Sequence, residues 1–485
     1  MGSLKDKTLN GLFWSFFDSF GKQSISFVIG IILARLLDPS VYGILGMIVI
    51  FMAISNVFIS SGFGTALIRK TDLNDADCNT TFIFNLGVAL LFYCLLFFTS
   101  PFIASFFEEP SLKLIIRVLG IGLLINAASI VQHSLMTKRI DFKTQSKISI
   151  TRTVCSGTVG IIMAYRGFGI WSLVAQQLVG GFLGTTLLWY YNTWKPKWEF
   201  SVRSFKELFG FGSKLLASAL IDTTFNNLYY LVIGKYFAAA QLGYYTRAQG
   251  YSNLFSSNLT GIIERVSYPV LSSIQDKPDA LAKGYKKILK SSILISFVAM
   301  MGLAACSESL VVILIGEKWA PCIPYLQLLC FSQMLYPLHA INLNILKVKG
   351  RSDLFLKLEI IKKCISIPVI IIGIYLGIKA MLIAMILNGC IAYILNSYYT
   401  ARLIEYSTIQ QLKDITPSFL VGAATCLVMW SVELLMLSVV QQFLVQLLVG
   451  GLFLILILEI FKLNEYLEIK SIFHKYVRKV SFKRT

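Results

Sequence analysis

Charged residues inside long apolar segments are the first candidates for chemistry in this chain. Lys22 lies in the apolar segment 12–34, and Arg265 lies in the segment 246–271. Each segment is long enough to cross the hydrocarbon core of a bilayer, which takes about 20 residues of helix. A charge at that depth is costly unless it is paired or faces water, so each cation is a candidate for an anion-binding site.

Lys22 belongs to a polar stripe along one predicted helix. Ser15, Ser19, Lys22 and Ser26 recur at helical spacing and therefore share one face. Asp18 lies one turn before Lys22, close enough to pair with it. The stripe therefore predicts either the wall of a polar cavity or a pair between Asp18 and Lys22 that is buried between helices.

The segment 213–234 carries a similar set of polar residues. Asp222 and Asn226 share one helical face, and Asn227 lies beside them. An internal repeat with an offset of 200 residues, described below, makes Asp222 the counterpart of Lys22. We hypothesise that these two charges form a gate, attracting each other in one conformation and separating in another. The alternative is a polar cluster that only packs this segment against its neighbours.

Arg265 is the best candidate for contact with phosphate oxygens. A guanidinium is permanently charged and binds such oxygens in a two-pronged fork, which an ammonium group does not reproduce. Asn258 lies on the same helical face, and Glu264 is the adjacent residue. The alternatives for Arg265 are a local pair with Glu264 and extension of the side chain to the membrane interface about two turns away.

Three further cations are candidates for the same site. Arg152 lies about one turn inside the segment 146–165, so extension to the interface is the favoured interpretation of this residue. Glu359, Lys362 and Lys363 stand at helical spacing within one segment. They form either a self-paired patch or a second basic contact for the anion.

Uncharged polar residues in two other segments could bind hydroxyl groups of a ligand. Asn126 lies in the segment 114–136, and Gln333 and Asn342 lie in the segment 321–346. Hydrogen bonds between helices explain these residues equally well. The nine cysteines form no C-x-x-C pair and the three histidines share no ligand spacing, so we expect no metal site. We also expect no catalytic residues and no cofactor.

The elements that must position these residues follow from the composition. The chain has 485 residues, of which 56% are hydrophobic and 14% are charged. In soluble domains about a quarter of all residues are charged, so most of this chain must face lipid. The sequence predicts an all-α integral membrane protein with about 14 transmembrane helices, and twelve is the alternative. The expected segments are 12–34, 43–66, 81–103, 114–136, 146–165, 168–190, 213–234, 246–271, 288–314, 321–346, 355–375, 378–400, 415–438 and 441–461.

Lysine and arginine residues gather in alternate connections between these segments. The basic stretches lie at 69–70, 138–147, 195–214, 277–290, 347–357 and after 462. This alternation is the positive-inside pattern, and it places both termini in the cytoplasm. The formal net charge of +19 is then a topology signal and a contact for anionic lipids, so nucleic acid is not expected as a partner.

One long polar connection, 193–212, divides the chain. Aromatic and basic residues alternate along it at helical spacing, which predicts an amphipathic helix on the cytoplasmic interface. We expect an N-lobe at 1–192, a C-lobe at 213–402, two further helices at 403–463 and a basic cytoplasmic tail at 464–485.

The two predicted lobes resemble each other in sequence. Residues 32–43 (ILARLLDPSVYG) match residues 232–243 (VIGKYFAAAQLG), and residues 169–181 match residues 377–389. Six segments in each half keep the same orientation, so the halves are predicted to be parallel repeats related by a pseudo-two-fold axis along the membrane normal. Two such lobes around a central cavity suit a transporter that works by alternating access.

Several motifs resemble a known family. ILARLLDPSVYG at 32–43 and GFGTALI at 62–68 look like the opening of polysaccharide-exporting flippases of the multidrug/oligosaccharidyl-lipid/polysaccharide (MOP) superfamily. RIDF at 139–142, LGYY at 242–245 and GEKW at 316–319 follow in the family's order. Across nearly the whole chain the sequence is similar to transporters of the Wzx/WzxC type, which serve lipopolysaccharide and capsule biosynthesis.

The resemblance implies a function. It implies translocation of undecaprenyl-diphosphate-linked oligosaccharide units, of O-antigen, capsule or exopolysaccharide, across the bacterial inner membrane. It also implies partners in the polymerase and glycosyltransferase machinery, and it leaves protons and sodium open as coupling ions. The alternatives are a peptidoglycan-precursor flippase and a cation-coupled multidrug exporter of the same superfamily. A membrane glycosyltransferase or polymerase is disfavoured because the outer connections are short.

Overall fold

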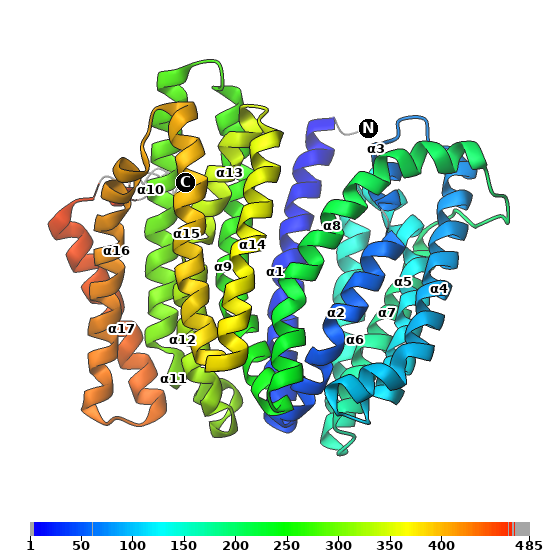
Figure 1. Cartoon of the computed structure of the whole chain (residues 1–485), viewed down its shortest axis with the longest axis horizontal. Helices are drawn as coiled ribbons and strands as arrows, with labels where there is room; N and C mark the ends of the chain where they lie inside the picture. The colour runs from blue at the N-terminus through cyan, green and yellow to red at the C-terminus, as the bar shows by residue number, and fades with distance from the viewer. Residues whose placement is uncertain (1–3, 61, 464, 468–469, 471–485) are drawn as a thin grey trace, which may run out of the picture. The chain divides into compact units, whose positions relative to one another are not determined.

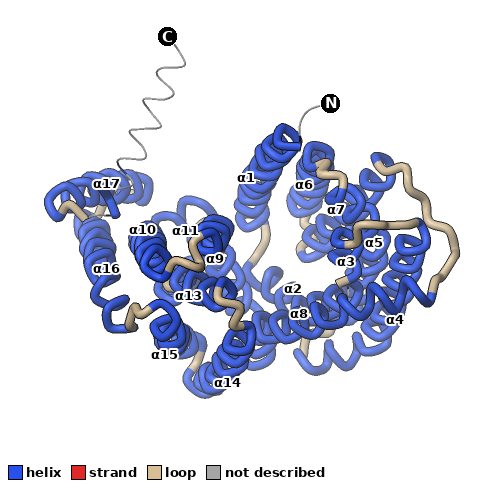
Figure 2. The backbone as a smooth tube through the Cα atoms, turned by 90° about the horizontal axis from the view of Figure 1, so that it is seen from above, coloured by secondary structure: helices blue, strands red, loops and turns tan. Residues whose placement is uncertain are grey.

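The computed structural model describes residues 4–60, 62–463, 465–467 and 470. The side chains of residues 4–19 and of Ser352 lie outside this description, so it does not cover the side chains of Asp18 and Ser19. The described residues form helices joined by mostly short connections, and no strand occurs among them (Figure 2). The predicted all-α class is therefore confirmed.

The chain divides into two compact units, Met1–Gly243 and Tyr244–Thr485. The helices that lie wholly in the first unit are α1 (Leu4–Leu36), α2 (Pro39–Ser60), α3 (Phe63–Arg69), α4 (Asp75–Phe107), α5 (Leu112–Lys138), α6 (Phe142–Tyr165), α7 (Ile170–Tyr191) and α8 (Val202–Tyr236) (Figure 1). Helix α9 (Ala239–Ser273) begins at the end of this unit and continues in the second.

The second unit contains both long helices and short helical turns. They are α10 (Pro278–Ala305), α11 (Ser307–Ile315), the 3-10 turn η1 (Glu317–Cys322), α12 (Ile323–Gln333), α13 (Tyr336–Val348), α14 (Ser352–Leu376), α15 (Ile378–Ile404), α16 (Thr408–Ser431), the 3-10 turn η2 (Val432–Leu435) and α17 (Val439–Phe461). Within this unit α10 packs on α16, α12 packs on α15, and α14 packs on α15.

Eight helical segments in the described part of the chain are each long and apolar enough to cross a membrane. They are Pro39–Arg69, Asp75–Phe107, Leu112–Lys138, Phe142–Tyr165, Pro278–Ala305, Ile378–Ile404, Thr408–Leu435 and Val439–Phe461. The eight segments do not include α8 and α9, which carry Asp222 and the pair Glu264 and Arg265. The count of fourteen spans stays a prediction.

Several expected spans are broken helices. The expected span 43–66 consists of α2 and α3, and Gly62 between them has a φ of 71°, a backbone conformation that glycine adopts without strain. The expected span 288–314 is interrupted at Cys306, and the expected span 321–346 is divided into α12 and α13. Hydropathy predicts the length of an apolar run, whereas a short break inside the run leaves its hydropathy unchanged.

The predicted amphipathic helix at 193–212 is not a separate element. A loop follows α7, and α8 then runs without interruption from Val202 to Tyr236. Ser201 caps this helix by accepting a hydrogen bond from the backbone N–H of Ser204 at 3.2 Å. Figure 1 shows α8 passing over α3 and then descending beside α2, against which it packs. The predicted lobe boundaries, which rest on the sequence repeat, stay a prediction.

One close contact within the first unit has the form that the repeat predicts. A Cβ atom at Gly43 in α2 would lie 1.7 Å from the carbonyl oxygen of Ala239 in α9. A Cβ atom at Gly243 in α9 would lie 1.9 Å from the carbonyl oxygen of Pro39 in α2. Gly43 and Gly243 are 200 residues apart, and so are Pro39 and Ala239. The contact is therefore reciprocal, as in an interface with two-fold symmetry.

Candidate functional site

The main candidate site is a polar cleft in the first unit, between α1, α5, α6 and α7. Its volume is about 540 Å³, within the range of pockets that hold small-molecule ligands, about 300–1,000 Å³. Its polar lining residues are Lys22, Ser26, Asn126, Ser129, Arg152, Thr153, Ser156, Gln176, Gln177 and Thr185.

Glycines of α7 make room for this cleft. Gly180 and Gly184 stand four residues apart and therefore share one face, which packs on α6. A Cβ atom at Gly184 would lie 3.1 Å from Cδ of Arg152, and a Cβ atom at Gly180 would lie 3.2 Å from Oγ of Ser156. Small residues let neighbouring helices approach closely, and here they also leave space for the side chains of α6.

Among the residues whose side chains the structure describes, the charge of the cleft is cationic. Lys22 of α1 and Arg152 of α6 line it, and none of these described lining residues is a carboxylate. Both side chains are exposed, and neither forms an ion pair with any residue that the structure describes. Arg152, for which extension to the interface was the favoured interpretation, thus shares a cavity with Lys22. Together they provide a site in which an anion can replace lost hydration by charge-assisted hydrogen bonds.

Hydroxyl and amide groups form the rest of the wall. Asn126 of α5 donates a hydrogen bond from Nδ2 to Oδ1 of Asn56 in α2 at 2.7 Å. Thr185 of α7 donates to the carbonyl oxygen of Ile125 at 3.1 Å. These bonds hold α2, α5 and α7 together at the cleft, and Gln176 and Gln177 supply further donors and acceptors. The wall can therefore bind hydroxyl-rich groups.

The predicted residues of α8 do not line the cleft, and the side chains of Asp18 and Ser19 lie outside the described residues. Asp222 and Asn226 are exposed on α8, and Asn227 donates a hydrogen bond to the carbonyl oxygen of Thr223 in its own helix at 2.7 Å. Lys22 forms no ion pair with a described residue, and hence none with Asp222. The gate between these two charges therefore stays a hypothesis about another conformation.

The predicted residues of α9 lie in the second unit. Arg265 and Glu264 are both exposed and form no ion pair with each other or with another described residue. Asn258 donates a hydrogen bond to the carbonyl oxygen of Leu254 in the same helix. No carboxylate among the described residues pairs with Arg265 in this structure, and its contact with phosphate stays a prediction.

Two other predicted sets in the second unit are engaged in contacts within the protein. Lys362 pairs with Glu359 at 2.5 Å, as the self-paired interpretation expects, and Lys363 is half-buried beside them. Gln333 and Asn342 are buried, accepting hydrogen bonds from Ser256 at 2.6 Å and from Tyr285 at 2.9 Å. In this structure Gln333 and Asn342 therefore form hydrogen bonds to neighbouring helices and do not line an open cavity.

The cleft includes residues that sequence reasoning missed. Gln176, Gln177, Thr153 and Ser156 were not predicted, because uncharged polar residues in apolar segments most often pack against other helices. Their only signal in the sequence was the set of glycines at 180, 181 and 184, which marks a close helix contact.

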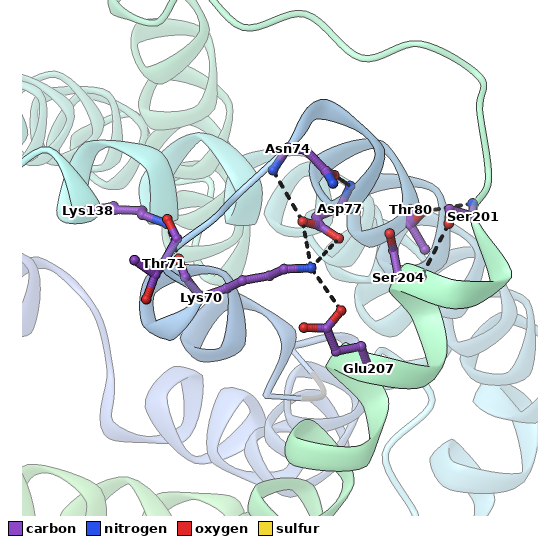
Figure 3. A network of polar contacts seen from close by, with 9 residues as sticks. All are labelled: Lys70, Thr71, Asn74, Asp77, Thr80, Lys138, Ser201, Ser204 and Glu207. Atoms are coloured by element: carbon purple, nitrogen blue, oxygen red, sulfur yellow. Dashed lines mark hydrogen bonds and ion pairs between the residues drawn. The ribbon is translucent and has the colours of Figure 1, made fainter.

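A second polar cluster in the first unit connects α8 to α4 (Figure 3). Nζ of Lys70 lies 3.0 Å from a carboxylate oxygen of Asp77 in α4 and 2.9 Å from one of Glu207 in α8. Asp77 is fully buried and also accepts a hydrogen bond from the backbone N–H of Asn74 at 3.2 Å. Lys138 donates to the carbonyl oxygens of Lys70 and Thr71.

The charges of this cluster satisfy one another. Burial alone lowers the pKa of Lys70, but its hydrogen bonds to Glu207 and Asp77 outweigh this effect and raise the pKa above its ordinary value. Aromatic rings pack beside the cluster, with Phe205 of α8 stacked on Phe209 at 5.3 Å and close to Phe84 of α4 at 5.1 Å. We interpret the cluster as a structural anchor for the start of α8.

Comparison with known proteins identifies the family. Residues 32–324 match the model of the polysaccharide biosynthesis protein family. The chain is 28% identical over 302 residues to the teichuronic acid biosynthesis protein TuaB of Bacillus subtilis (strain 168), and the match spans 62% of each chain. It is 26% identical over 401 residues to the lipopolysaccharide biosynthesis protein WzxC of Escherichia coli (strain K12), covering 81% of this chain and 80% of that protein.

A solved structure shares the fold. The lipid II flippase MurJ, in an inward closed conformation, superposes with a TM-score of 0.74 at 16% identity, covering 93% of this chain and 98% of MurJ. Together with the apolar helices, this fold shows an all-helical, multi-pass membrane protein. The resemblance that the motifs suggested is confirmed, and the chain belongs to the polysaccharide biosynthesis protein family.

Proposed function

We propose that this protein translocates lipid-linked oligosaccharides across the bacterial inner membrane. The observation that carries the proposal is the cleft of the first unit, whose described lining residues combine two cations and no carboxylate with a wall of hydroxyl and amide groups. Each part of such a substrate has its own physical requirement. The diphosphate carries charge that cannot cross hydrocarbon unaided, the sugars need hydrogen-bond partners, and the polyprenyl tail can stay in lipid.

In this proposal Lys22 and Arg152 hold the diphosphate. Arg152 presents a permanently charged fork to phosphate oxygens, while Lys22 adds a compact second charge from a different helix. Gln176, Gln177 and Asn126 bind the first sugars. Because the cleft holds about 540 Å³, it takes the diphosphate with the sugars next to it, and the rest of the oligosaccharide extends out of it.

Orientation and partners also belong to the proposal. The alternation of basic connections supports cytoplasmic termini, and the parallel repeat supports alternating access of two lobes. The names of TuaB and WzxC support a substrate from the biosynthesis of an extracellular polysaccharide. Polymerase and glycosyltransferase enzymes are then the partners.

The precursor of peptidoglycan is the second candidate substrate. The fold is shared with a lipid II flippase over 93% of this chain. Both candidate substrates would present a diphosphate to the same cations, so the geometry of the cleft does not discriminate between them.

The test begins with deletion of the gene in its host. We expect an undecaprenyl-linked oligosaccharide of an extracellular polysaccharide to accumulate, identified by mass spectrometry of the lipid extract. Accumulation of the peptidoglycan precursor would instead select the second candidate. Accumulation of neither would refute a role as a flippase for both substrates.

Variants then test the cleft. Arg152→Gln removes a charged hydrogen-bond donor worth about 1.5–3 kcal/mol, so polymer export should fall by roughly 10- to 100-fold. Arg166→Gln is the matched control, because Arg166 is an exposed arginine just after the end of the same helix and lies outside the cleft. Full export by the double variant Lys22→Gln and Arg152→Gln would remove the cleft from the mechanism.

A further inference from the structure

The second unit contains two adjoining recesses, where α10 begins, α15 ends and α16 begins. They have volumes of about 390 Å³ and about 540 Å³, and Glu405 and Gln410 line both. All of their lining residues lie in the second unit. The recesses play no part in the cleft of the first unit, so the inference does not rest on the function proposed above.

Basic side chains predominate in the recesses. Lys283, Lys286, Arg402 and Lys413 line them, against the two carboxylates Glu405 and Asp414. The charge of Asp414 is already compensated within the protein. Its carboxylate lies 2.7 Å from Nζ of Lys286 and 3.8 Å from Nζ of Lys290, and it accepts a hydrogen bond from the Tyr406 hydroxyl.

Three cations are left to face the recesses. Lys283, Arg402 and Lys413 are exposed, and none forms an ion pair with a residue that the structure describes. The guanidinium carbon of Arg402 lies 4.5 Å above the ring of Tyr398, which holds this side chain against the second recess. The one carboxylate that remains, Glu405, leaves a net positive charge. An anion is therefore the ligand that this arrangement favours.

Apolar side chains continue from the recesses along the surface of the unit. Tyr398 and Ile409 line the second recess, and Ile409 is 67% exposed. Leu412 and Leu420 lie on the same face of α16 at helical spacing and are also exposed. A free phosphate ion gains no binding energy from this apolar surface, whereas the acyl chains of a lipid would cover it and remove it from water.

We propose that these recesses bind the phosphate headgroup of an anionic phospholipid. Arg402, Lys413 and Lys283 contact the phosphodiester oxygens, and the N-terminus of α16 adds a partial positive charge. The acyl chains lie along Ile409, Leu412 and the apolar face that follows. The bound lipid thereby links α15 to α16, and so joins the last helix of the predicted repeat to the two helices outside it.

The test uses the purified full-length protein in detergent and native mass spectrometry. The probe is 1-palmitoyl-2-oleoyl-phosphatidylglycerol, with the corresponding phosphatidylcholine as the zwitterionic comparison. We expect the variant Arg402→Gln, Lys413→Gln to bind phosphatidylglycerol roughly tenfold more weakly or worse, because it loses two charged contacts. The matched control is Arg166→Gln, Lys379→Gln, which removes two exposed charges outside the basic connections and should bind as the unchanged protein does.

Further variants and a displacement experiment distinguish a bound lipid from a bound free anion. Ile409→Ser with Leu412→Ser keeps every charge and should also weaken binding of phosphatidylglycerol. Displacement of the lipid by millimolar inorganic phosphate, with no effect of these serine variants, would show an ion site and overturn the proposal. Equal binding by the glutamine variant and its control, at matched melting temperatures, would overturn it as well. The single variant Arg402→Gln gives the same comparison if the double variant unfolds.

Discussion

The anchor of α8 gives the sharpest prediction about stability. Replacing Lys70 by methionine leaves the carboxylate of Asp77 buried without its cation, although the hydrogen bond from the backbone N–H of Asn74 remains. Breaking a buried ion pair from one side costs about 3–5 kcal/mol. Because that hydrogen bond remains and the Lys70 side chain is 18% exposed, we take the lower end, about 3 kcal/mol. Glu207→Gln should cost less than about 1 kcal/mol, because that side chain is 56% exposed.

The measurement is the apparent melting temperature of the purified protein in detergent. A unit of this size shifts by about 2–4 °C for each kcal/mol, so Lys70→Met should lower the midpoint by about 6–12 °C. Glu207→Gln should lower it by at most a few degrees. The double variant Lys70→Met, Asp77→Asn should recover most of the loss, since it leaves no buried charge unpaired. Equal midpoints for Lys70→Met and Glu207→Gln would refute the assignment of Asp77 as the buried partner.

Three more predictions follow from the first unit. Gly184→Leu should place its side chain against Arg152, fill the cleft and lower polymer export roughly tenfold at unchanged protein level. The control Gly451→Leu, at a glycine with open space around it, should leave export unchanged. Equal export by the two variants would contradict the role of the cleft. Gly43→Val should abolish accumulation of folded protein in the membrane, as judged by size-exclusion chromatography, because its Cβ would overlap backbone that cannot move aside. The ion pair with Lys235 of α8 lowers the pKa of Glu108. The small stabilising effect of this ion pair is therefore present above the ordinary pKa of a glutamate and is lost as pH falls through the lowered pKa. Melting temperatures of Glu108→Gln and of the unchanged protein should differ only above that pH range.

The fold was largely predictable because apolar length and charge alternation report directly on the bilayer. The repeat at an offset of 200 residues also placed Gly43 and Gly243 in equivalent positions, and the structure pairs them. The breaks at Gly62 and Cys306 were missed, since hydropathy averages over a window that is longer than such a break.

The candidate site was predictable only in part. Helical spacing placed Lys22 and Ser26 on one face, and both line the cleft. Spacing does not say which neighbouring helix a face meets, and this is why Gln333 was expected in a cavity but is buried against Ser256. Gln176 was missed for the converse reason, because the neighbour beside it is Gly160 of α6, and spacing along α7 does not reveal that contact.

The reciprocal contact between Gly43 and Gly243 restricts how this chain can change during evolution. Each helical residue turns the chain by about 100°, so inserting one residue just before either glycine would point that glycine away from its carbonyl partner. The insertion would break both halves of the contact together, because each glycine faces the first turn of the other's helix. Insertions near residues 39 or 239 should therefore be rare among functional relatives, whereas the tips of distant loops can lengthen freely.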